Sequence, residues 1–251
     1  MTSLTRSQVE GALLQLTGSF LRNPLRCNGG CARCTGACSP GWDICYACAN
    51  TYAGKLPDAM GFMTYAAQGT QAGAVMHGYK SKPPMAEHEV TVALLAYLGR
   101  IYHSRCAEVL VHAPITHWSV VPSTSGRPGD HPLLRLTSAD QPMPLWPLTR
   151  HPAAPVPSRQ STTADLFAAN PLPANSHVLL IEDTFVSGTR PISATRTLRA
   201  VGAAHVTLLC VARWLSAPFI GSHAPRDSLL VRSLLPVYDP AICPYTGVGC
   251  P

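Results

Sequence analysis

The sequence has few charged residues and no long apolar run. No apolar stretch is long enough to span a membrane, and polar residues interrupt the stretch from Ala12 to Phe20, which argues against a secretory signal peptide. We therefore expect a cytoplasmic protein with no membrane partner. No internal repeat is apparent, so the 251 residues indicate one large domain, or one domain with an appendage.

Charge of neither sign is abundant either. Charged residues make up only 13% of the chain, and the net charge of +6 favours anionic ligands weakly without by itself indicating nucleic acid. The ten histidines show no metal-binding spacing. Apolar residues, by contrast, make up 46% of the chain, and 24 residues are proline. This composition predicts a full core with long ordered loops rather than disorder.

The stretch Val178–Thr189 organises the rest of the chain. Its four leading apolar residues are typical of a strand buried on both faces. Glu182 and Asp183 follow where that strand would end, and small or hydroxylated residues surround Gly188. Pro191 then suits the first turn of a helix. The pattern predicts a strand, a loop and a helix, with two acids at the carboxyl end of the strand.

This position in an α/β sheet is where ligands bind, and a small-residue loop at a helix N-terminus offers free N–H groups to an anion. A second buried strand, His205–Ala212, follows the helix and predicts a right-handed crossover in a mainly parallel sheet. Arg213 and Trp214 would end this strand on the ligand side, where the Trp214 ring either stacks on a base or packs in the protein. The alternative for the whole stretch is an ordinary strand–helix turn with two solvated acids.

The strand–loop–helix pattern resembles the phosphoribosyl pyrophosphate (PRPP) motif of type I phosphoribosyltransferases. The resemblance implies that Glu182 and Asp183 hold the ribose hydroxyls and that the following loop holds the 5′-phosphate. The loop residues are Thr184, Val186, Ser187, Gly188 and Thr189. Two departures stand out: Glu182 where Asp is commoner, and Arg190 where a small or hydroxyl residue is usual. We expect neither Asp183→Asn nor Gly188→Val to unfold the protein, because both positions are expected at a strand end outside the core.

A second loop with anion-binding character follows the apolar strand that begins at Trp118. Successive N–H groups in such a turn form an anion nest, and an arginine at its end offers a fork of donors to phosphate. Its residues are Ser123, Thr124, Ser125, Gly126 and Arg127. The resemblance implies that this loop binds pyrophosphate, whereas an ordinary Ser-rich turn is the alternative. His131 and Arg135 can reach the same site, although we expect them on a helix surface.

Six of the ten cysteines lie in one short segment near the N-terminus. Two Cys-x2-Cys pairs separated by ten residues have the spacing of a zinc ribbon and predict one metal site at Cys31, Cys34, Cys45 and Cys48. Four more cysteines predict a second metal that joins the two ends of the chain: Cys27, Cys38, Cys243 and Cys250. Disulfides and an iron–sulfur cluster are the alternatives, and a reducing compartment argues against disulfides. We expect Cys106 and Cys210 in the core.

A Cys-x2-Cys module ahead of a phosphoribosyltransferase domain resembles the ComF family. The resemblance covers most of the chain and rests on the cysteine pairs, Tyr79-Lys80, the loop near Ser123 and the 178–189 motif. It implies an α/β, type I phosphoribosyltransferase-like fold with a mainly parallel sheet flanked by helices. Residues 1–55 would form a helix and a small zinc module, and residues 56–251 the main domain, with the Cys243/Cys250 tail packing back on the module.

Two further helices are predicted from apolar spacing. Residues 4–22 carry an apolar face of Val9, Leu13, Leu16 and Phe20, and residues 86–105 one of Val90, Leu94, Tyr97, Leu98 and Ile101. Six prolines exclude regular helix between residues 140 and 157, and we expect an edge element near 155–158.

The resemblance implies a transferase that uses Mg2+, with Glu182, Asp183 and Lys80 as its catalytic residues. Lys80, on a mobile loop, would close on the pyrophosphate, although a surface loop with two solvated lysines is the alternative. The phosphoribosyl group would pass to an unidentified nitrogenous acceptor with release of pyrophosphate. No N-terminal Cys is present for a glutamine-amidotransferase half. The alternative function is a non-catalytic PRPP-binding, zinc-containing regulatory or nucleic-acid-associated protein, and a homo-oligomer is left open.

Overall fold

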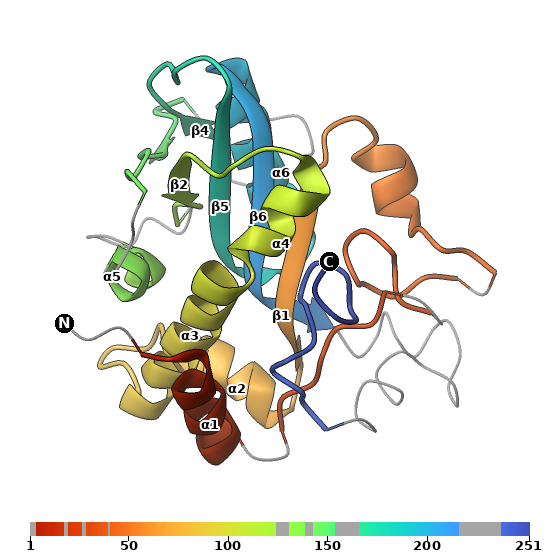
Figure 1. Cartoon of the computed structure of the whole chain (residues 1–251), viewed down its shortest axis with the longest axis vertical. Helices are drawn as coiled ribbons and strands as arrows, with labels where there is room; N and C mark the ends of the chain where they lie inside the picture. The colour runs from red at the N-terminus through yellow and green to blue at the C-terminus, as the bar shows by residue number, and fades with distance from the viewer. Residues whose placement is uncertain are drawn as a thin grey trace.

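The computed structural model describes residues 4–17, 20–26, 29–39, 41–123, 131–138, 143–153, 166–215 and 237–251. Its centre is a sheet of four parallel strands in the order β1-β6-β5-β2, with helices on both faces (Figure 1). The strands are β1 (Ala59–Ala67), β2 (His117–Val120), β5 (Ser176–Phe185) and β6 (Ala203–Leu215). The predicted α/β fold with a mainly parallel sheet is confirmed.

Strand β5 occupies a central position because its apolar residues are buried on both faces. Leu179 and Ile181 pack into one hydrophobic cluster, and Val178 and Leu180 pack into another on the opposite face. The strand is longer than predicted: it continues to Phe185, so the two acids lie within the strand rather than after it. Helix α6 (Thr189–Ala200) connects β5 to β6, and these two strands pair in parallel, as expected.

One face of the sheet is covered by the helices that precede β5 in the chain (Figure 1). They are α1 (Arg6–Thr17), α2 (Gln71–Gly78), α3 (Ala86–Tyr97), the π-helical turn η2 (Leu98–Tyr102), α4 (Ser104–Val111) and α5 (Pro132–Ser138). The other face is covered by α6, by the cysteine-rich segment with its π-helical turn η1 (Ala47–Thr51), and by a two-stranded antiparallel sheet of β3 (Thr149–Arg150) and β4 (Phe167–Ala168). The two faces are therefore built from different parts of the chain.

The predicted helix at 86–105 is divided between α3, η2 and the start of α4, and its buried face agrees with the prediction at Leu98 but not at Val90. Val90 is 46% exposed, whereas Val92, Leu95 and Ala96 are buried. Helix α3 packs against α1, α2 and α5, and these contacts rotate the buried stripe away from Val90. In α1, Leu16 is likewise 42% exposed.

The segment rich in proline forms no helix among its described residues, and it contributes β3 to the small antiparallel sheet. The edge element expected near 155–158 lies outside the described residues. Across the described part of the chain, no helix combines the length and the apolar character needed to cross a membrane.

Candidate functional site

Glu182 and Asp183 lie at the carboxyl end of β5 and are buried, with 1% and 0% of their surface exposed. The prediction that this end of the strand lies outside the core is therefore wrong. The reason is the extra length of β5, which pairs Glu182 with Cys210 of the buried strand β6 and keeps both acids inside the sheet, beyond the last residue paired with β2. Burying a carboxylate is costly unless charged or hydrogen-bonding partners accompany it, so the contacts of these two side chains matter.

Asp183 receives three groups from distant parts of the chain. The Tyr79 hydroxyl donates a hydrogen bond to Oδ2, and the Lys80 ammonium forms an ion pair with the same oxygen. Nε2 of His131 lies 3.2 Å from Oδ2. The structure thus brings Lys80 to the acid pair, in place of the alternative of a solvated surface lysine. It also brings His131 there, and not to the helix surface where we expected it.

Glu182 is paired with a residue of the following helix. An Nη atom of Arg190 lies 3.2 Å from Glu182 Oε1 and 3.7 Å from Asp183 Oδ1. Arg190 stands where phosphoribosyltransferases usually have a small or hydroxyl residue. In this structure its guanidinium contacts the two acids. Its place in the first turn of α6 explains the contact, because that turn begins beside the end of β5.

The two carboxyl groups have opposite titration behaviour. Burial raises the pKa of Glu182 to about 8, and the neighbouring Asp183 charge adds to the rise while Arg190 opposes it. Burial also opposes ionisation of Asp183, but Lys80 and His131 outweigh it and hold the pKa of this carboxyl well below its usual range. Near neutral pH the pair therefore carries its negative charge on Asp183 and its proton on Glu182. With Lys80 and Arg190 charged, the cluster is electropositive and suits an anionic ligand.

The loop after the acids has the geometry of an anion cradle. Gly188 adopts φ 88°, a conformation that L-residues rarely adopt, and it is the residue before α6. The Ser187 and Thr189 hydroxyls lie 3.1 Å apart. The first N–H groups of a helix have no intrahelical acceptor, and in α6 the Thr189 N–H lies 3.5 Å from the Ser187 hydroxyl of this loop. The loop therefore offers hydroxyl and N–H donors beside the acid pair.

Two residues of other segments hold this loop in place. The Tyr52 hydroxyl donates to the Ser187 carbonyl at 2.6 Å. The Arg213 guanidinium donates to the carbonyls of Phe185 and Val186, both at 2.9 Å, and to the Cys34 carbonyl at 2.9 Å. The cysteine-rich segment and the loop are thereby joined. Sequence reasoning placed Arg213 on the ligand side but missed Tyr52, whose partner is 135 residues away.

The second predicted anion loop begins next to the acid pair. Strand β2 runs parallel to β5, and the Val121 N–H donates to the Ile181 carbonyl at 2.9 Å. Ser123 follows two residues later, whereas Thr124, Ser125, Gly126 and Arg127 lie outside the described residues.

Two other site candidates have partners elsewhere. Arg135 forms an ion pair with Glu89. Trp214 packs edge-on against His77, with ring centroids 5.2 Å apart.

The fold resembles that of adenine phosphoribosyltransferase. One such solved structure has a TM-score of 0.31 and 18% identity, over 59% of this chain and 76% of that one. A second, from Saccharomyces cerevisiae and complexed with D-2,5-dideoxy-2,5-imino-altritol 1,6-bisphosphate and adenine, has a TM-score of 0.30 and 16% identity, over 59% and 75%. No protein-family model and no curated protein matches the chain. At these scores the likeness assigns no activity, so function has to be argued from the site.

Four cysteines form the predicted N-terminal cluster: the ligand atoms of Cys31, Cys34, Cys45 and Cys48 all lie within 4.8 Å of one another. Sγ of Cys34 and Sγ of Cys45 are 3.7 Å apart. A Zn–S bond of about 2.3 Å gives a tetrahedral edge of about 3.8 Å, which this separation matches. The backbone N–H of Cys45 also donates to Cys31 Sγ at 3.4 Å, as suits a thiolate.

The predicted second set of four cysteines is not assembled as expected. Cys243 and Cys250 lie with His103 and Cys106, so Cys106 is not simply a core residue. Cys38 packs beside the N-terminal cluster, on the opposite face of the sheet from Cys243, and the sheet separates the two. Cys27 lies outside the described residues. Cys210 is buried in the core, as predicted.

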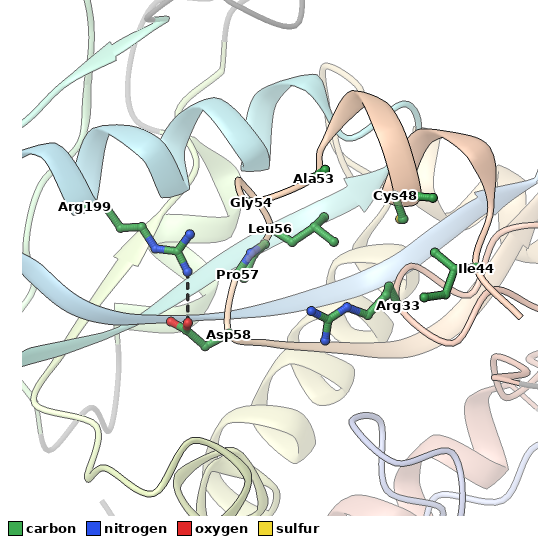
Figure 2. Close-up of a pocket in the computed structure, with 10 residues that line it drawn as sticks. Arg33, Ile44, Cys48, Ala53, Gly54, Leu56, Pro57, Asp58 and Arg199 are labelled. Atoms are coloured by element: carbon green, nitrogen blue, oxygen red, sulfur yellow. Dashed lines mark hydrogen bonds and ion pairs between the residues drawn. The ribbon is translucent and has the colours of Figure 1, made fainter.

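A cavity of about 440 Å³ lies elsewhere, between the cysteine-rich segment and the amino ends of the strands (Figure 2). Arg199, at the C-terminal end of α6, pairs with Asp58 across it at 3.0 Å. Asp58 directly precedes β1, so this cavity lies at the amino ends of the parallel strands, whereas Glu182 and Asp183 lie at the carboxyl end of β5. It is therefore not part of the acid-pair site.

Proposed function

We propose that this chain is a phosphoribosyltransferase-like protein that binds PRPP with Mg2+ and transfers the phosphoribosyl group to a nitrogenous acceptor. The observation that carries the proposal is the acid pair at the carboxyl end of the central strand, with Lys80 and Arg190 converging on it and the Gly188 loop following it. PRPP has a phosphate at one end, a pyrophosphate at the other and ribose hydroxyls between. The site offers acceptors for the hydroxyls between two segments with anion-binding character.

The acid pair has the chemistry that ribose hydroxyls and Mg2+ require. Glu182 Oε2 and Asp183 Oδ1 are buried and make no hydrogen bond to the described residues. Ionised carboxylate oxygens are the ligands that a hard cation prefers, so Asp183 is the ready ligand and Glu182 would release its proton to become one. Bound Mg2+ would neutralise phosphate charge of the substrate. Access of a ligand to them requires Lys80 and Arg190 to exchange their carboxylate partners for phosphate oxygens. Both are cations, so a phosphate can replace the partner that they give up.

The residues of this chain act mainly by positioning and charge. The Ser187–Thr189 segment holds the 5′-phosphate, and Glu182 and Asp183 fix the ribose. Lys80, with the loop that begins at Ser123, stabilises the departing pyrophosphate. The bond between the anomeric carbon and the pyrophosphate oxygen breaks as the acceptor nitrogen approaches from the other side. Positive charge develops on the ribose ring during this step, so orientation and fixed charges supply most of the rate.

We also propose that Cys31, Cys34, Cys45 and Cys48 hold a structural zinc. The zinc would fix the Cys34 carbonyl that accepts from Arg213, and with it the loop that Arg213 supports. A metal module joined to a phosphoribosyltransferase-like domain in this way is the feature that supports a ComF-like assignment. Its role here is structural, because four sulfur ligands leave no open position on the metal.

A second candidate function is a PRPP sensor without turnover. It is favoured by the closed acid pair, in which Tyr79, Lys80, His131 and Arg190 already contact the carboxylates. Binding would then move these groups, and the movement itself would be the output. Transferase and sensor differ in one observable, the consumption of PRPP.

The test is pyrophosphate release from PRPP and Mg2+ in the presence of a panel of purines, pyrimidines and simple amines. The proposed transferase releases one pyrophosphate for each PRPP consumed with at least one acceptor, and Lys80→Met slows the release. Binding of PRPP without release with any acceptor supports the sensor. Absence of binding rejects both functions.

A further inference from the structure

The segment around the start of α4 presents two metal-ligating side chains in one direction. His103 directly precedes α4, and Cys106 lies in the first turn of that helix. The Cys106 N–H donates to the His103 carbonyl at 3.1 Å, which closes the turn between them. Side chains three residues apart in a helical turn lie on the same side. His103 Nδ1 and Cys106 Sγ are accordingly 3.9 Å apart.

The C-terminal tail presents two more ligands through a turn of its own. The Cys243 N–H donates to the Val248 carbonyl at 2.7 Å, and the Gly247 N–H donates to the Cys243 carbonyl at 2.8 Å. Gly247 adopts φ 76°, which allows the chain to reverse. The reversal returns Cys250 to the side of Cys243, although six residues separate them. Each pair of ligands is therefore held by hydrogen bonds within its own segment.

The four ligand atoms meet at one point. His103 Nδ1 and the sulfurs of Cys106, Cys243 and Cys250 all lie within 4.8 Å of one another. Cys250 Sγ is 3.4 Å from His103 Nδ1. Zn–S bonds of about 2.3 Å and a Zn–N bond of about 2.0 Å give tetrahedral nitrogen–sulfur edges of about 3.5 Å, close to the spacings found here. A disulfide would use only two of the four groups and would leave the convergence of the others unexplained.

We propose that His103, Cys106, Cys243 and Cys250 form a second zinc site, which clasps the C-terminal tail to the start of α4. Binding deprotonates three thiols and takes up Zn2+ through the neutral His103 Nδ1, with Nε2 keeping its proton, so three protons leave and the site carries one negative charge. Three thiolates and one imidazole in a tetrahedron are a ligand set that zinc favours. The Arg6 guanidinium, which pairs with Glu10 at 2.6 Å, also lies beside Cys250 and offsets that charge.

The clasp would fix the tail over the open edge of the sheet. Among the described strands β1 is at the edge of the sheet, and the Phe62 N–H donates to the Pro244 carbonyl at 3.2 Å. The Tyr245 ring covers Gly61, where an added Cβ would lie 2.7 Å from the ring. Exposed strand edges invite pairing with other chains. Figure 1 shows the C-terminal tail beside α4 and β1. The four ligands include none of the residues placed at the acid pair, and the clasp does not depend on the proposed transferase activity.

The first test is the zinc content of the full chain, purified under reducing conditions and passed through a chelating column. The parent is expected to hold two zinc ions, and Cys250→Ser to hold one. Cys250 is exposed, so this substitution leaves the core unchanged. Cys38→Ser is the matched control, because Cys38 belongs to neither group of four, and it is expected to keep two. The proposal is overturned if Cys250→Ser keeps the zinc content of the parent, if Cys38→Ser loses an ion, or if the second ion is iron.

The second test needs no variant. Iodoacetamide is expected to label Cys250 slowly in the zinc-loaded parent and at least tenfold faster after a chelator has removed the metal, as followed by peptide mass spectrometry. An exposed thiol that were merely free would react at the same rate in both states. Equal rates, or a Cys243–Cys250 disulfide in the freshly purified protein, would overturn the clasp even if the variants failed to fold.

Discussion

The buried acid pair makes a pH-dependent prediction about Glu182→Gln. Glutamine has nearly the shape of a protonated glutamate but cannot ionise. If Glu182 is protonated in the folded protein near neutral pH, glutamine mimics the folded state. The substitution then removes only the ionisation of this carboxyl in the unfolded state, which favours unfolding. We therefore expect Glu182→Gln to stabilise the protein, and to do so more strongly as the pH rises.

The magnitude follows from the shift of the Glu182 carboxyl, whose pKa rises through burial from an ordinary 4.5 to about 8. The pKa of Glu182 is higher in the folded state than in the unfolded state. The stability that this carboxyl contributes is therefore fully present when the pH is below the unfolded-state pKa, and it is lost as the pH rises through the folded-state pKa. A pKa unit is worth about 1.4 kcal/mol, so the loss is on the order of 3 kcal/mol between about pH 5.5 and about pH 8.5. Glu182→Gln should gain that amount over the parent.

Urea unfolding of the parent and the variant at several pH values measures this difference. The gain should grow with pH for Glu182→Gln and stay near zero for Glu87→Gln, whose carboxyl is exposed at the start of α3. A variant that becomes less stable than the parent as the pH rises would show that Glu182 is ionised and held by its ion pair with Arg190. That result would refute the assignment of the proton.

Further predictions concern the loop, the ribose acid and the metal. Gly188→Ala should destabilise the protein more than Gly41→Ala in urea unfolding: both glycines have positive φ, but only at Gly188 would the new Cβ meet a ring atom, at 2.6 Å. Asp183→Asn should weaken PRPP binding roughly tenfold to a hundredfold by calorimetry. It should also lower stability, because the partly buried Lys80 ammonium loses its carboxylate partner. Tyr52→Phe should weaken PRPP binding while leaving the zinc content unchanged. Cys31→Ser should lower the zinc content by one ion and weaken PRPP binding as well.

The central part of the fold could be predicted because its evidence is local in the sequence. A short apolar run, two acids, a glycine loop and a proline specify β5, the loop and α6 without reference to distant residues. The paired cysteines at 31–34 and 45–48 are local in the same sense. Burial of the acids was missed because the apolar run ends at Ile181, whereas the strand does not.

The remaining features depend on contacts between distant segments. Tyr79 and Asp183 are 104 residues apart, and nothing in the spacing of either indicates their hydrogen bond. His103 lies at the end of the segment predicted as one helix, residues 86–105, and Cys106 just after it was predicted to be a core residue, so the spacing of this ligand pair was not recognised. The buried side of α3 is set by three neighbouring helices, which the periodicity of one segment cannot specify.

Calorimetric titration of the full chain with PRPP and Mg2+ tests the central claim most directly. The parent is expected to bind one PRPP per chain, Asp183→Asn to bind roughly tenfold to a hundredfold more weakly, and Cys38→Ser to bind as the parent does. A parent that does not bind PRPP, or an Asp183→Asn variant that binds it as tightly as the parent, would contradict the assignment of this site.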